Sequence, residues 1–596
     1  IKNQLKDVKT TKEGYELNFL GKSYAKLLAA LDSETVIIPD LSHNQKEENK
    51  NSKNLYITAD NLEALKHLLK SYWRKVKMIY IDPPYNTGSD GFVYNDRFNF
   101  TKKDLLDKLG FVDEQADHVL EMIHSSSSSH SAWLTFMYPR LYLAKQLLTE
   151  DGIIFISIDE NEQANLQLLC ADIFGDKSSE VLIWRKNGKQ GNTKNIQRFK
   201  NTHEYIVAVF MNKSETSIGK TKLLPNWKGT KTNPDNDPRG PWESGVISRM
   251  EEESRPESDN YYSISLPSGR ILTREFYVSK KEFNSLIQQN KIYFPKDGDG
   301  IPRLKIFQNE EQEYYFDSII DEMGTFTDAR AEIELIFGDK DVFDTPKPVK
   351  ILKELIRATT SKSDIIMDFF AGSSTTAHSM LELNSEDGGE RKFILVQLKE
   401  LTPEKSTARA MGYQTIDELG RERINRAAKL IQNALSEKIN RAGLITDGLI
   451  DPTSIDFGFK HFEVKVIENN QLTKLESFNP EVLLIDRGIL DEFGVQTILT
   501  TWMNLDGYGL SRDWKELRLA DYMAYQIDET IYLLNPDVSN KAVKALLEKY
   551  EDDHFVCNKI VMFGYSFTMS EIQSIKDNLK QVEGIRHITL DIIVRY

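Results

Sequence analysis

One stretch constrains the fold of this chain more than any other, and it reads Met78-Ile79-Tyr80-Ile81-Asp82-Pro83-Pro84-Tyr85. Its first four residues form the apolar run of a buried strand. Pro fixes φ and has no N–H to donate to a sheet, so the strand must end at Asp82. In an open α/β sheet, ligands bind at the carboxyl ends of the strands. The stretch therefore predicts a carboxylate, two prolyl carbonyls and an aromatic ring, held stiffly where chemistry takes place.

The polar groups of this turn suit a planar amine, such as the exocyclic amine of adenine, whose lone pair is delocalised into the ring. The carboxylate of Asp82 and the carbonyl of Pro83 can each accept a hydrogen bond from the NH2 group, which frees the lone pair for attack. The ring of Tyr85 can stack on a base that has left the duplex. The alternative is structural, a strand that ends in a Pro-Pro turn beside a solvated Asp.

A second stretch, residues 364–377, has the pattern of a strand, a tight turn and a helix. The apolar strand ends at Asp368, small residues follow it, and Thr375 begins the helix pattern. Small residues let the backbone approach a ligand closely. Taken alone, this is a weak signal, and a plain structural turn is the alternative.

Together, the two stretches resemble the S-adenosylmethionine-dependent amino-methyltransferases of DNA. The catalytic motif comes before the cofactor motif here, which resembles the β group of that family, with a target-recognition region between the two. The resemblance implies four catalytic residues: Asp82, Pro83, Pro84 and Tyr85. It implies cofactor binding by Asp60, Asn61, Lys347, Pro348, Asp368, Phe369, Phe370, Ala371, Gly372, Ser373, Ser374, Thr375 and Gln397.

Some of these cofactor residues also have a structural interpretation. Asp60 and Asn61 stand just before a helix pattern, where an N-cap is expected. Pro348 stands near the start of another helix. It belongs to the segment Thr345-Pro346-Lys347-Pro348, which resembles the cofactor-edge motif of the family. Both interpretations stay open for these residues.

Gln397 ends the strand that follows the cofactor turn. Many relatives of the wider fold place an acid at this point, where it binds the ribose hydroxyls. Gln can also bond a hydroxyl, so we expect Gln397 to take this role, with Glu400 three residues further on.

The charge of the chain limits where DNA can bind. The net charge is −15 over 596 residues, so any DNA contact must come from local basic patches. The segment 185–203 has no acidic residue and contains the glycines of a loop, which predicts contact with phosphates. A solvated basic loop is the alternative. The candidate DNA-binding residues are Arg185, Lys186, Lys189, Lys194, Arg198 and Lys200.

Several classes of protein do not fit the composition. Residues 1–13 are polar and mixed in charge, unlike a signal peptide, and no apolar run has the length of a membrane span. The two cysteines, Cys170 and Cys557, are too few for a zinc cluster and fit a reducing compartment. We therefore expect a cytoplasmic protein with no metal site and no membrane contact.

Strand and helix patterns alternate along most of the chain, which predicts an α/β fold with a doubly wound, mostly parallel, Rossmann-like sheet. The alternation stops over an inserted region with its own small core, and a separate α/β unit follows near the end. The predicted parts are an N-terminal helical arm (1–53), a catalytic part (54–210), a target-recognition domain (211–340), a cofactor part with a long helix for scaffolding or dimerisation (341–455) and a C-terminal assembly domain (456–596).

The arrangement of the whole chain, including Gly507-Tyr508 and Leu519-Ala520-Asp521-Tyr522, resembles the modification (Mod) subunits of type III restriction systems. The resemblance implies a site-specific adenine-N6 methyltransferase that uses S-adenosylmethionine and acts on double-stranded DNA. It also implies a homodimer, with a separate helicase–nuclease restriction subunit as partner. The C-terminal domain either docks that partner or completes the methyltransferase core.

Two other functions are open alternatives. A cytosine-N4 methyltransferase is the nearest, although that chemistry goes more often with Ser than with Asp at position 82. A non-catalytic DNA-specificity subunit would keep the fold but lose the motif residues, and here they are intact.

Overall fold

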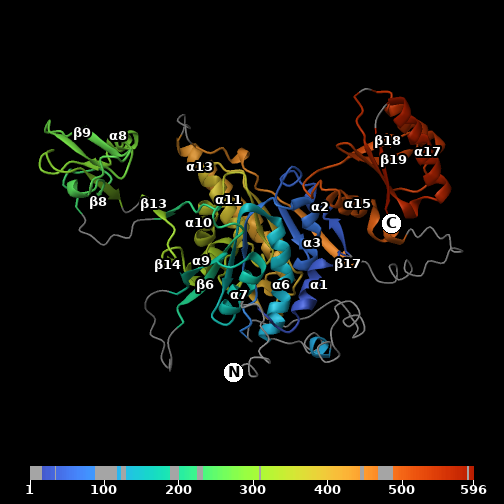
Figure 1. Cartoon of the computed structure of the whole chain (residues 1–596), viewed down its shortest axis with the longest axis horizontal. Helices are drawn as coiled ribbons and strands as arrows, with labels where there is room; N and C mark the ends of the chain where they lie inside the picture. The colour runs from blue at the N-terminus through green and yellow to red at the C-terminus, as the bar shows by residue number, and fades with distance from the viewer. Residues whose placement is uncertain are drawn as a thin grey trace, which may run out of the picture. The chain divides into compact units, whose positions relative to one another are not determined.

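A computed structural model describes residues 17–33, 35–87, 117–121, 129–187, 201–223, 232–307, 310–442, 449–466, 488–552, 554–586 and 589–595. The chain divides into two compact units (Figure 1). The large unit comprises Ile1–Ile218 and Asp317–Tyr596, and the small unit comprises Gly219–Phe316.

The large unit is built on a sheet of ten described strands in the order β1-β17-β2-β16-β15-β3-β4-β6-β5-β14. The six neighbours from β17 to β4 run parallel, while β1 and β6 run antiparallel to their neighbours. This confirms the predicted mostly parallel sheet. The strands are β1 (Thr35–Pro39), β17 (Lys460–Val466), β2 (Leu55–Thr58), β16 (Lys392–Gln397), β15 (Ile365–Asp368), β3 (Val76–Ile81), β4 (Leu148–Ile158), β6 (His203–Phe210), β5 (Ser179–Arg185) and β14 (Ile319–Ile320).

The helices of this sheet form two groups, whose members pack on one another. In Figure 1 the first group is blue to cyan and the second runs from yellow-green to orange. The first group is α1 (Lys22–Ala30), α3 (Asn61–Tyr72), α6 (His130–Leu147) and α7 (Gln163–Phe174), and the second is α9 (Phe326–Phe337), α10 (Val349–Thr359), α11 (Thr375–Asp387) and α13 (Ile416–Ala442). Two short helices are α2 (Leu41–Asn44) and α12 (Thr407–Ala410). Among the described helices, none combines the length and apolar character that a membrane span needs.

The central strands are covered on both faces, which explains their uninterrupted apolar runs. In β3, Met78, Ile79, Tyr80 and Ile81 are all buried, although successive side chains point to opposite faces of the sheet. A strand of this kind can only sit in the middle of a two-sided sheet, and its end is therefore surrounded by other elements.

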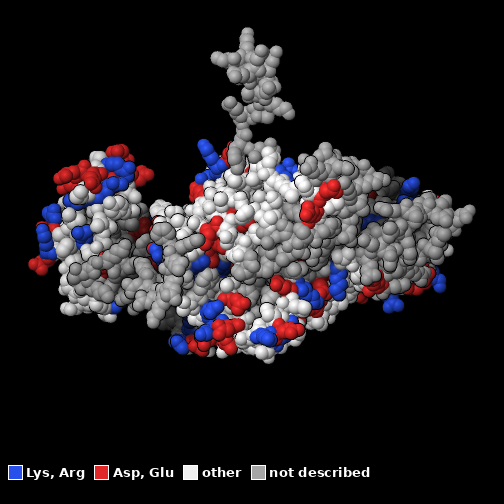
Figure 2. Space-filling model, turned by 90° about the horizontal axis from the view of Figure 1, so that it is seen from below, with Lys and Arg blue, Asp and Glu red and all other residues white. Residues whose placement is uncertain are grey.

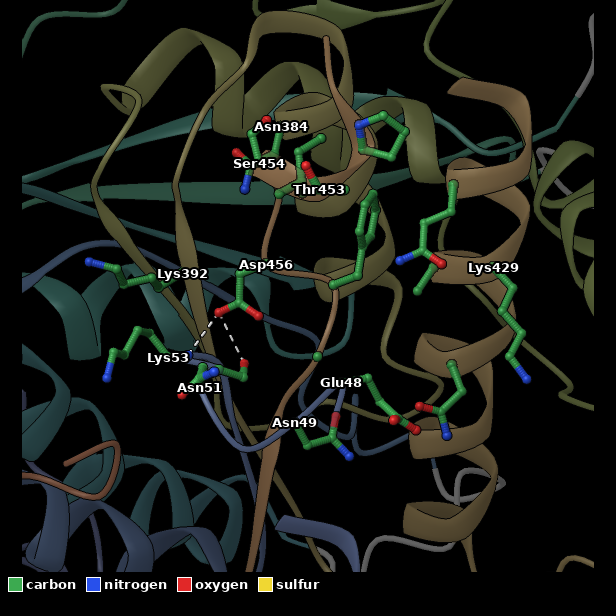
Figure 3. A pocket seen from close by; sticks show the side chains of 18 of the residues that line it. Glu48, Asn49, Asn51, Lys53, Asn384, Lys392, Lys429, Thr453, Ser454 and Asp456 are labelled. Carbon is green, nitrogen blue, oxygen red and sulfur yellow. Dashed lines mark hydrogen bonds between the residues drawn. The ribbon is translucent and has the colours of Figure 1, made fainter. Parts of the chain in front are cut away.

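One edge of the sheet differs from the predicted domain boundaries. Residues 460–466 form β17, which pairs with β2 and β1 inside the central sheet instead of opening the C-terminal domain. Residues 35–39, expected in a helical arm, form β1. Asp456, which precedes β17, accepts hydrogen bonds from the Ser52 hydroxyl at 3.0 Å and the Lys53 amide at 2.8 Å. A cavity lies beside these residues (Figure 3). An alternating pattern predicts a strand, but it does not say which sheet the strand joins.

The C-terminal part has its own sheet, ordered β18-β19-β20-β21-β22. Alternate residues of its strands serve two cores. Ile531 and Leu533 pack with α16 and α17, while Tyr532 and Leu534 pack with α15. The elements are α15 (Gly488–Leu505), β18 (Lys515–Leu519), β19 (Tyr522–Ile527), β20 (Thr530–Leu533), α16 (Asn540–Lys549), β21 (Lys559–Phe563), α17 (Met569–Arg586) and β22 (Asp591–Arg595).

Helix α15 also packs on the central sheet. The amide of Ile37 in β1 donates to the Thr501 hydroxyl at 2.9 Å. The Asn504 side chain donates to the carbonyl of His67 at 2.7 Å, and the Ser71 hydroxyl donates to the Asn504 carbonyl at 2.6 Å. One face of α15 therefore belongs to the C-terminal sheet, and polar groups along the helix fix it to β1 and α3.

The small unit lies within the stretch predicted as an insertion. Its strands are β7 (Lys220–Leu223), β8 (Trp242–Val246), β9 (Tyr261–Ser265), β10 (Ile271–Glu275), β11 (Ile292–Tyr293), β12 (Arg303–Phe307) and β13 (Gln312–Tyr315), and its helix is α8 (Lys280–Gln288). The ladder between β7 and β13 brings together the start and the end of the unit. An apolar cluster that includes Phe276 and Phe283 forms its core.

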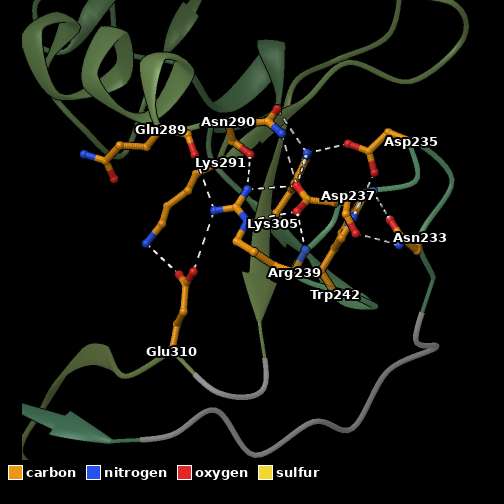
Figure 4. Close-up of polar contacts among 10 residues, drawn as sticks. All are labelled: Asn233, Asp235, Asp237, Arg239, Trp242, Gln289, Asn290, Lys291, Lys305 and Glu310. Atoms are coloured by element: carbon orange, nitrogen blue, oxygen red, sulfur yellow. Dashed lines mark hydrogen bonds and ion pairs between the residues drawn. The ribbon is translucent and has the colours of Figure 1, made fainter. Parts of the chain in front are cut away.

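A buried ion cluster holds a loop of the small unit against β12 (Figure 4). The Lys305 ammonium has no exposed surface and contacts Asp235 and Asp237, the latter at 2.8 Å. The guanidinium of Arg239 and the Lys305 ammonium hold the pKa of Asp237 well below its usual range. Because removing one member would leave a buried charge unpaired, the loop and the strand depend on each other.

The placement of β17 predicts how the chain tolerates truncation. A chain that ends at Ile450 should be insoluble or melt at a clearly lower temperature, because it loses a strand from between β1 and β2. A chain that ends after Val466 keeps that strand and should be the more stable of the two. Thermal unfolding of the two truncations and the full chain tests this. Equal melting temperatures for the two truncations would contradict it.

Candidate active site

The two motifs meet because β3 and β15 are parallel neighbours. Met78 and Ile79 pair with Ile366 and Met367, so both strands end at the same edge of the sheet. A cavity of about 600 Å³ lies at this edge. Its lining includes Asp82, Pro83, Tyr85, Asp368, Gly372 and Glu400. The predicted catalytic and cofactor turns therefore face one cavity, whose size is that of a small-molecule site.

Two hydrogen bonds hold the catalytic turn, one at Asp82 and one at Pro84. The Tyr85 hydroxyl donates to Asp82 Oδ1 at 2.7 Å. The Trp133 indole N–H donates to the Pro84 carbonyl at 2.8 Å. This engages the Pro84 carbonyl inside the protein, so the Pro83 carbonyl is the candidate acceptor for an amine. Burial and the Asp82 carboxylate raise the pKa of Tyr85 well above its usual value, which keeps its hydroxyl protonated as a donor.

Lys347 lies with the catalytic turn. Its ammonium donates to both carboxylate oxygens of Asp82, each at 2.9 Å, and to the Tyr85 hydroxyl at 2.8 Å. Glu204 of β6, which was not among the predicted site residues, lies 3.4 Å from the same ammonium. The sequence placed Lys347 at the cofactor edge, whereas its hydrogen bonds and ion pairs are with Asp82, Tyr85 and Glu204.

The cofactor turn has the backbone that close approach to a ligand requires. Gly372 has φ +48°, in the left-handed region, and Ser374 has φ +63°. The carboxyl group of Asp368 accepts from the Thr376 hydroxyl at 2.6 Å and the Phe370 amide at 3.0 Å. Burial raises the pKa of Asp368 to about 7, so a cationic group bound beside it would stabilise its carboxylate form.

Six predicted cofactor residues are not in the cavity lining: Asp60, Asn61, Pro348, Phe369, Ser374 and Gln397. Among them, Gln397 and Asn61 support the turn, and Asp60 caps α3. The Gln397 side chain accepts a hydrogen bond from the Gly372 amide at 2.7 Å. Of Gln397 and Glu400, it is Glu400 that lies in the cavity lining. Asp60 caps α3 by accepting from Leu62 N at 2.9 Å. The Asn61 side chain donates to the Phe369 carbonyl at 2.9 Å. The N-cap interpretation of Asp60 is therefore what the geometry shows.

Helix α13 braces the cofactor turn, a role that the sequence did not reveal. A Cβ atom on Gly420 would lie 2.6 Å from Ser374 Oγ and 3.0 Å from the Gly372 carbonyl oxygen, so only glycine allows this packing. One turn further on, the fully buried Arg423 donates to the Ser373 and Thr375 hydroxyls at 2.8 and 2.7 Å. An isolated Gly inside a charged helix was the available signal, since such a Gly often marks a packing requirement.

The structure describes the predicted DNA-binding loop only at its two ends, residues 185–187 and 201–203. Arg185 forms an ion pair with Asp321 at 2.7 Å, and Lys186 lies 3.3 Å from Glu204. Lys189, Lys194, Arg198 and Lys200 lie outside the described residues. The phosphate contacts of this loop stay a prediction.

The site fits a nucleoside cofactor that carries positive charge. The turn at Gly372 offers close backbone approach, and Glu400 places in the lining a carboxylate that is able to accept from hydroxyl groups. The carboxylates of Asp82 and Asp368 face the same cavity. Negative charge around the cavity favours a sulfonium or ammonium group.

Comparison with known proteins agrees with the fold and the site. A family model described as DNA methylase matches residues 76–402, which include both turns. A second model, the C-terminal domain of the type III restriction–modification protein EcoP15I, matches residues 493–588. The fold and the first match define a DNA methylase, an enzyme that transfers methyl groups from S-adenosylmethionine.

Full-length relatives identify the subfamily. The StyLTI Mod subunit of Salmonella typhimurium is 35% identical, covering 96% of this chain and 88% of that protein. The EcoPI Mod subunit of Escherichia phage P1 is 36% identical over 99% of this chain and 93% of that protein. The EcoP15I Mod subunit of Escherichia coli is 34% identical over 99% and 92%. The chain belongs to the Mod subunits of type III restriction–modification enzymes.

The left-handed turn predicts the effect of substituting Gly372. Gly372→Val should weaken S-adenosylmethionine binding by about tenfold or more, because a β-branched residue at φ +48° is strained by about 1–3 kcal/mol. Calorimetry with S-adenosylmethionine measures the dissociation constant. Gly388→Val is the matched control, since Gly388 has φ +66° at the far end of α11. An unchanged Kd in Gly372→Val, or an equal loss in both variants, would contradict the assignment.

Proposed function

We propose that this chain is the site-specific adenine-N6 methyltransferase of a type III restriction–modification system and that Asp82 receives the target amine. The observation that carries this proposal is the shared cavity: the Asp82 turn and the Asp368 turn open into the same space at the carboxyl ends of β3 and β15. The Asp82 turn would present hydrogen-bond acceptors to a base, and the Asp368 turn would present backbone that the methyl donor can approach closely.

The residues of the catalytic turn would act on the amine before transfer. A carboxylate oxygen of Asp82 and the carbonyl of Pro83 each accept one N–H of the adenine NH2 group. This draws the nitrogen toward tetrahedral geometry and makes its lone pair available. The flipped base would stack on the ring of Tyr85, whose hydroxyl is anchored to Asp82. Holding the two reactants in line supplies much of the rate increase.

S-adenosylmethionine supplies the electrophilic methyl group when it is bound. On transfer, N6 would gain the methyl group as the sulfur–carbon bond breaks with its electron pair left on sulfur, and the cationic amine would then release a proton. In this step Asp82 stabilises the positive charge that develops on N6.

The target base separates the main alternatives. Asp82, rather than Ser, favours adenine N6 over cytosine N4. The intact set of Asp82, Lys347 and Glu204 contacts is not expected in a non-catalytic specificity subunit. Digestion of DNA from cells carrying the gene, followed by nucleoside mass spectrometry, distinguishes N6-methyladenine from N4-methylcytosine and from unmodified DNA.

The small unit and the basic loop are the proposed contacts with double-stranded DNA. Residues 219–316 form a separate core between the catalytic and cofactor parts of the chain, as expected of a target-recognition domain. On the face in Figure 2, acidic and basic side chains of the described residues are intermixed. We assign the phosphate contacts to the basic loop of residues 185–203, because that segment has no acidic residue.

Two protein partners complete the proposal. The C-terminal sheet matches the family model of a type III C-terminal domain, so we assign it the docking of a restriction subunit. We also propose a homodimer, as the Mod resemblance implies, in which one protomer reads the DNA while the other methylates it. Sedimentation of the full chain with and without DNA tests the dimer.

The role of Asp82 is tested by Asp82→Ala. The variant should lose methylation by about a hundredfold or more, because the acceptor for the reacting amine is gone. Transfer of tritiated methyl groups to unmethylated bacterial DNA measures the rate, and filter binding checks that DNA affinity changes little. Wild-type turnover in this variant would overturn the catalytic assignment.

The basic loop is tested through its salt dependence. Joint replacement of Lys189, Lys194 and Arg198 by Gln should weaken DNA binding on all sequences alike. Each lost phosphate contact should lower the slope of log K against log salt by about one. Replacing Lys541, Lys544 and Lys549, which are exposed on or near α16 in the C-terminal part, gives a charge-matched control outside the proposed DNA contacts. An unchanged slope would show that the loop is solvated surface.

A further inference from the structure

The ammonium group of Lys347 occupies a built site. It is buried, and three groups surround it: the Asp82 carboxylate, the Tyr85 hydroxyl and the Glu204 carboxylate, at 2.9, 2.8 and 3.4 Å. Aromatic rings enclose it as well, with the Tyr85 ring centroid at 5.2 Å and that of Trp184 at 5.8 Å. A charge taken out of water in this way is costly unless it is fully paired, so its position is closely determined.

The backbone that carries Lys347 is fixed from both sides. Pro346 and Pro348 restrict its neighbours, and all three residues are buried. The first helical amide of α10, at Val349, donates to the Glu332 carboxylate at 3.0 Å. The side chain therefore reaches Asp82 from a rigid base, as a positioning group requires.

Counting acceptor sites shows what this contact does to Asp82. A carboxylate offers about four lone-pair sites. Oδ1 uses two of them, for Lys347 and Tyr85, and Oδ2 uses one, for Lys347. One site on Oδ2 remains after these three bonds. The carboxylate plane is thus fixed by its protein partners, with a single direction left for an incoming N–H.

We propose that Lys347 is a positioning residue for Asp82, which orients the carboxylate so that Oδ2 receives the adenine amine, and that Glu204 retains the ammonium in place. The inference rests on the proposed function of Asp82 and assigns roles to Lys347 and Glu204 in that site. It replaces the cofactor-edge role that the sequence indicated for Lys347.

Charged and polar side chains from several elements act on the Lys347 ammonium. Asp82 and Tyr85 follow β3, and Glu204 lies on β6. Lys186 follows β5 and lies 3.3 Å from Glu204, and Asp368 ends β15. Burial alone would lower the pKa of Lys347, but Asp82 and Glu204 outweigh it and raise that pKa above the usual value. The ammonium of Lys347 therefore stays charged over the working pH range.

The positioning and cofactor roles of Lys347 predict different kinetics. If Lys347 orients Asp82, Lys347→Met should lower kcat by about a hundredfold while the Kd for S-adenosylmethionine stays within about twofold. Lys347→Arg should recover part of kcat. Lys350→Met, at the second residue of α10 with its ammonium on the Glu322 carbonyl, is the matched control and should behave like wild type.

The outcomes separate the possibilities. A raised Kd for S-adenosylmethionine with normal kcat at saturation would overturn the proposal in favour of cofactor contact, and so would unchanged kinetics. If Lys347→Met does not fold, Glu204→Gln decides: a lowered kcat with an unchanged Kd supports the proposal, and wild-type kcat overturns it. If Lys347→Met and Glu204→Gln both fold, the fold-loss of kcat in the double variant should be smaller than the product of the two single fold-losses. Inactivity of Asp82→Ala beside a normal Lys347→Met would overturn only this inference, whereas an active Asp82→Ala would overturn the proposed function itself.

Discussion

The parallel pairing of β3 with β15 is the constraint on which the site depends. Its register, Met78 to Ile366 and Ile79 to Met367, sets where both strands end. Both strands are apolar on both faces, so a slip of one residue would exchange the side chains between the two helix layers. The same pairing that builds the core therefore places the catalytic turn opposite the cofactor turn. The order of the two motifs along the chain has no effect on this geometry.

The site geometry does not depend on what lies between the two motifs along the chain, so the chain can accommodate an insertion there. The chain leaves the central sheet after β6 and returns at β14, which pairs with β5 at the edge. The ladder of β7 with β13 closes the small unit at the point where the chain enters and leaves it. A unit attached in this way can change its sequence without disturbing β3 and β15.

The parts of the site that the sequence predicted are those set by local chemistry. Two prolines end β3 at Asp82 whatever surrounds them, and small residues after Asp368 allow the left-handed turn at Gly372. The missed parts depend on partners far away in sequence. Glu204 reads as an ordinary strand residue until Lys347 lies beside it. The same limit explains β17, because a period-two pattern gives a strand and its faces but not its neighbours.

The missed residues also show where the fold accepts a cost in stability. Burial lowers the pKa of Arg423 to about 10, and two of its nitrogens, Nε and Nη2, have no hydrogen-bond partner among the described residues. A buried charge with incomplete bonding opposes folding, so an apolar residue there would favour stability. Arg423 instead bonds Ser373 and Thr375, beside the strained backbone of Ser374. Helix α13 thus braces the cofactor turn twice, through the hydrogen bonds of Arg423 and through the close packing at Gly420.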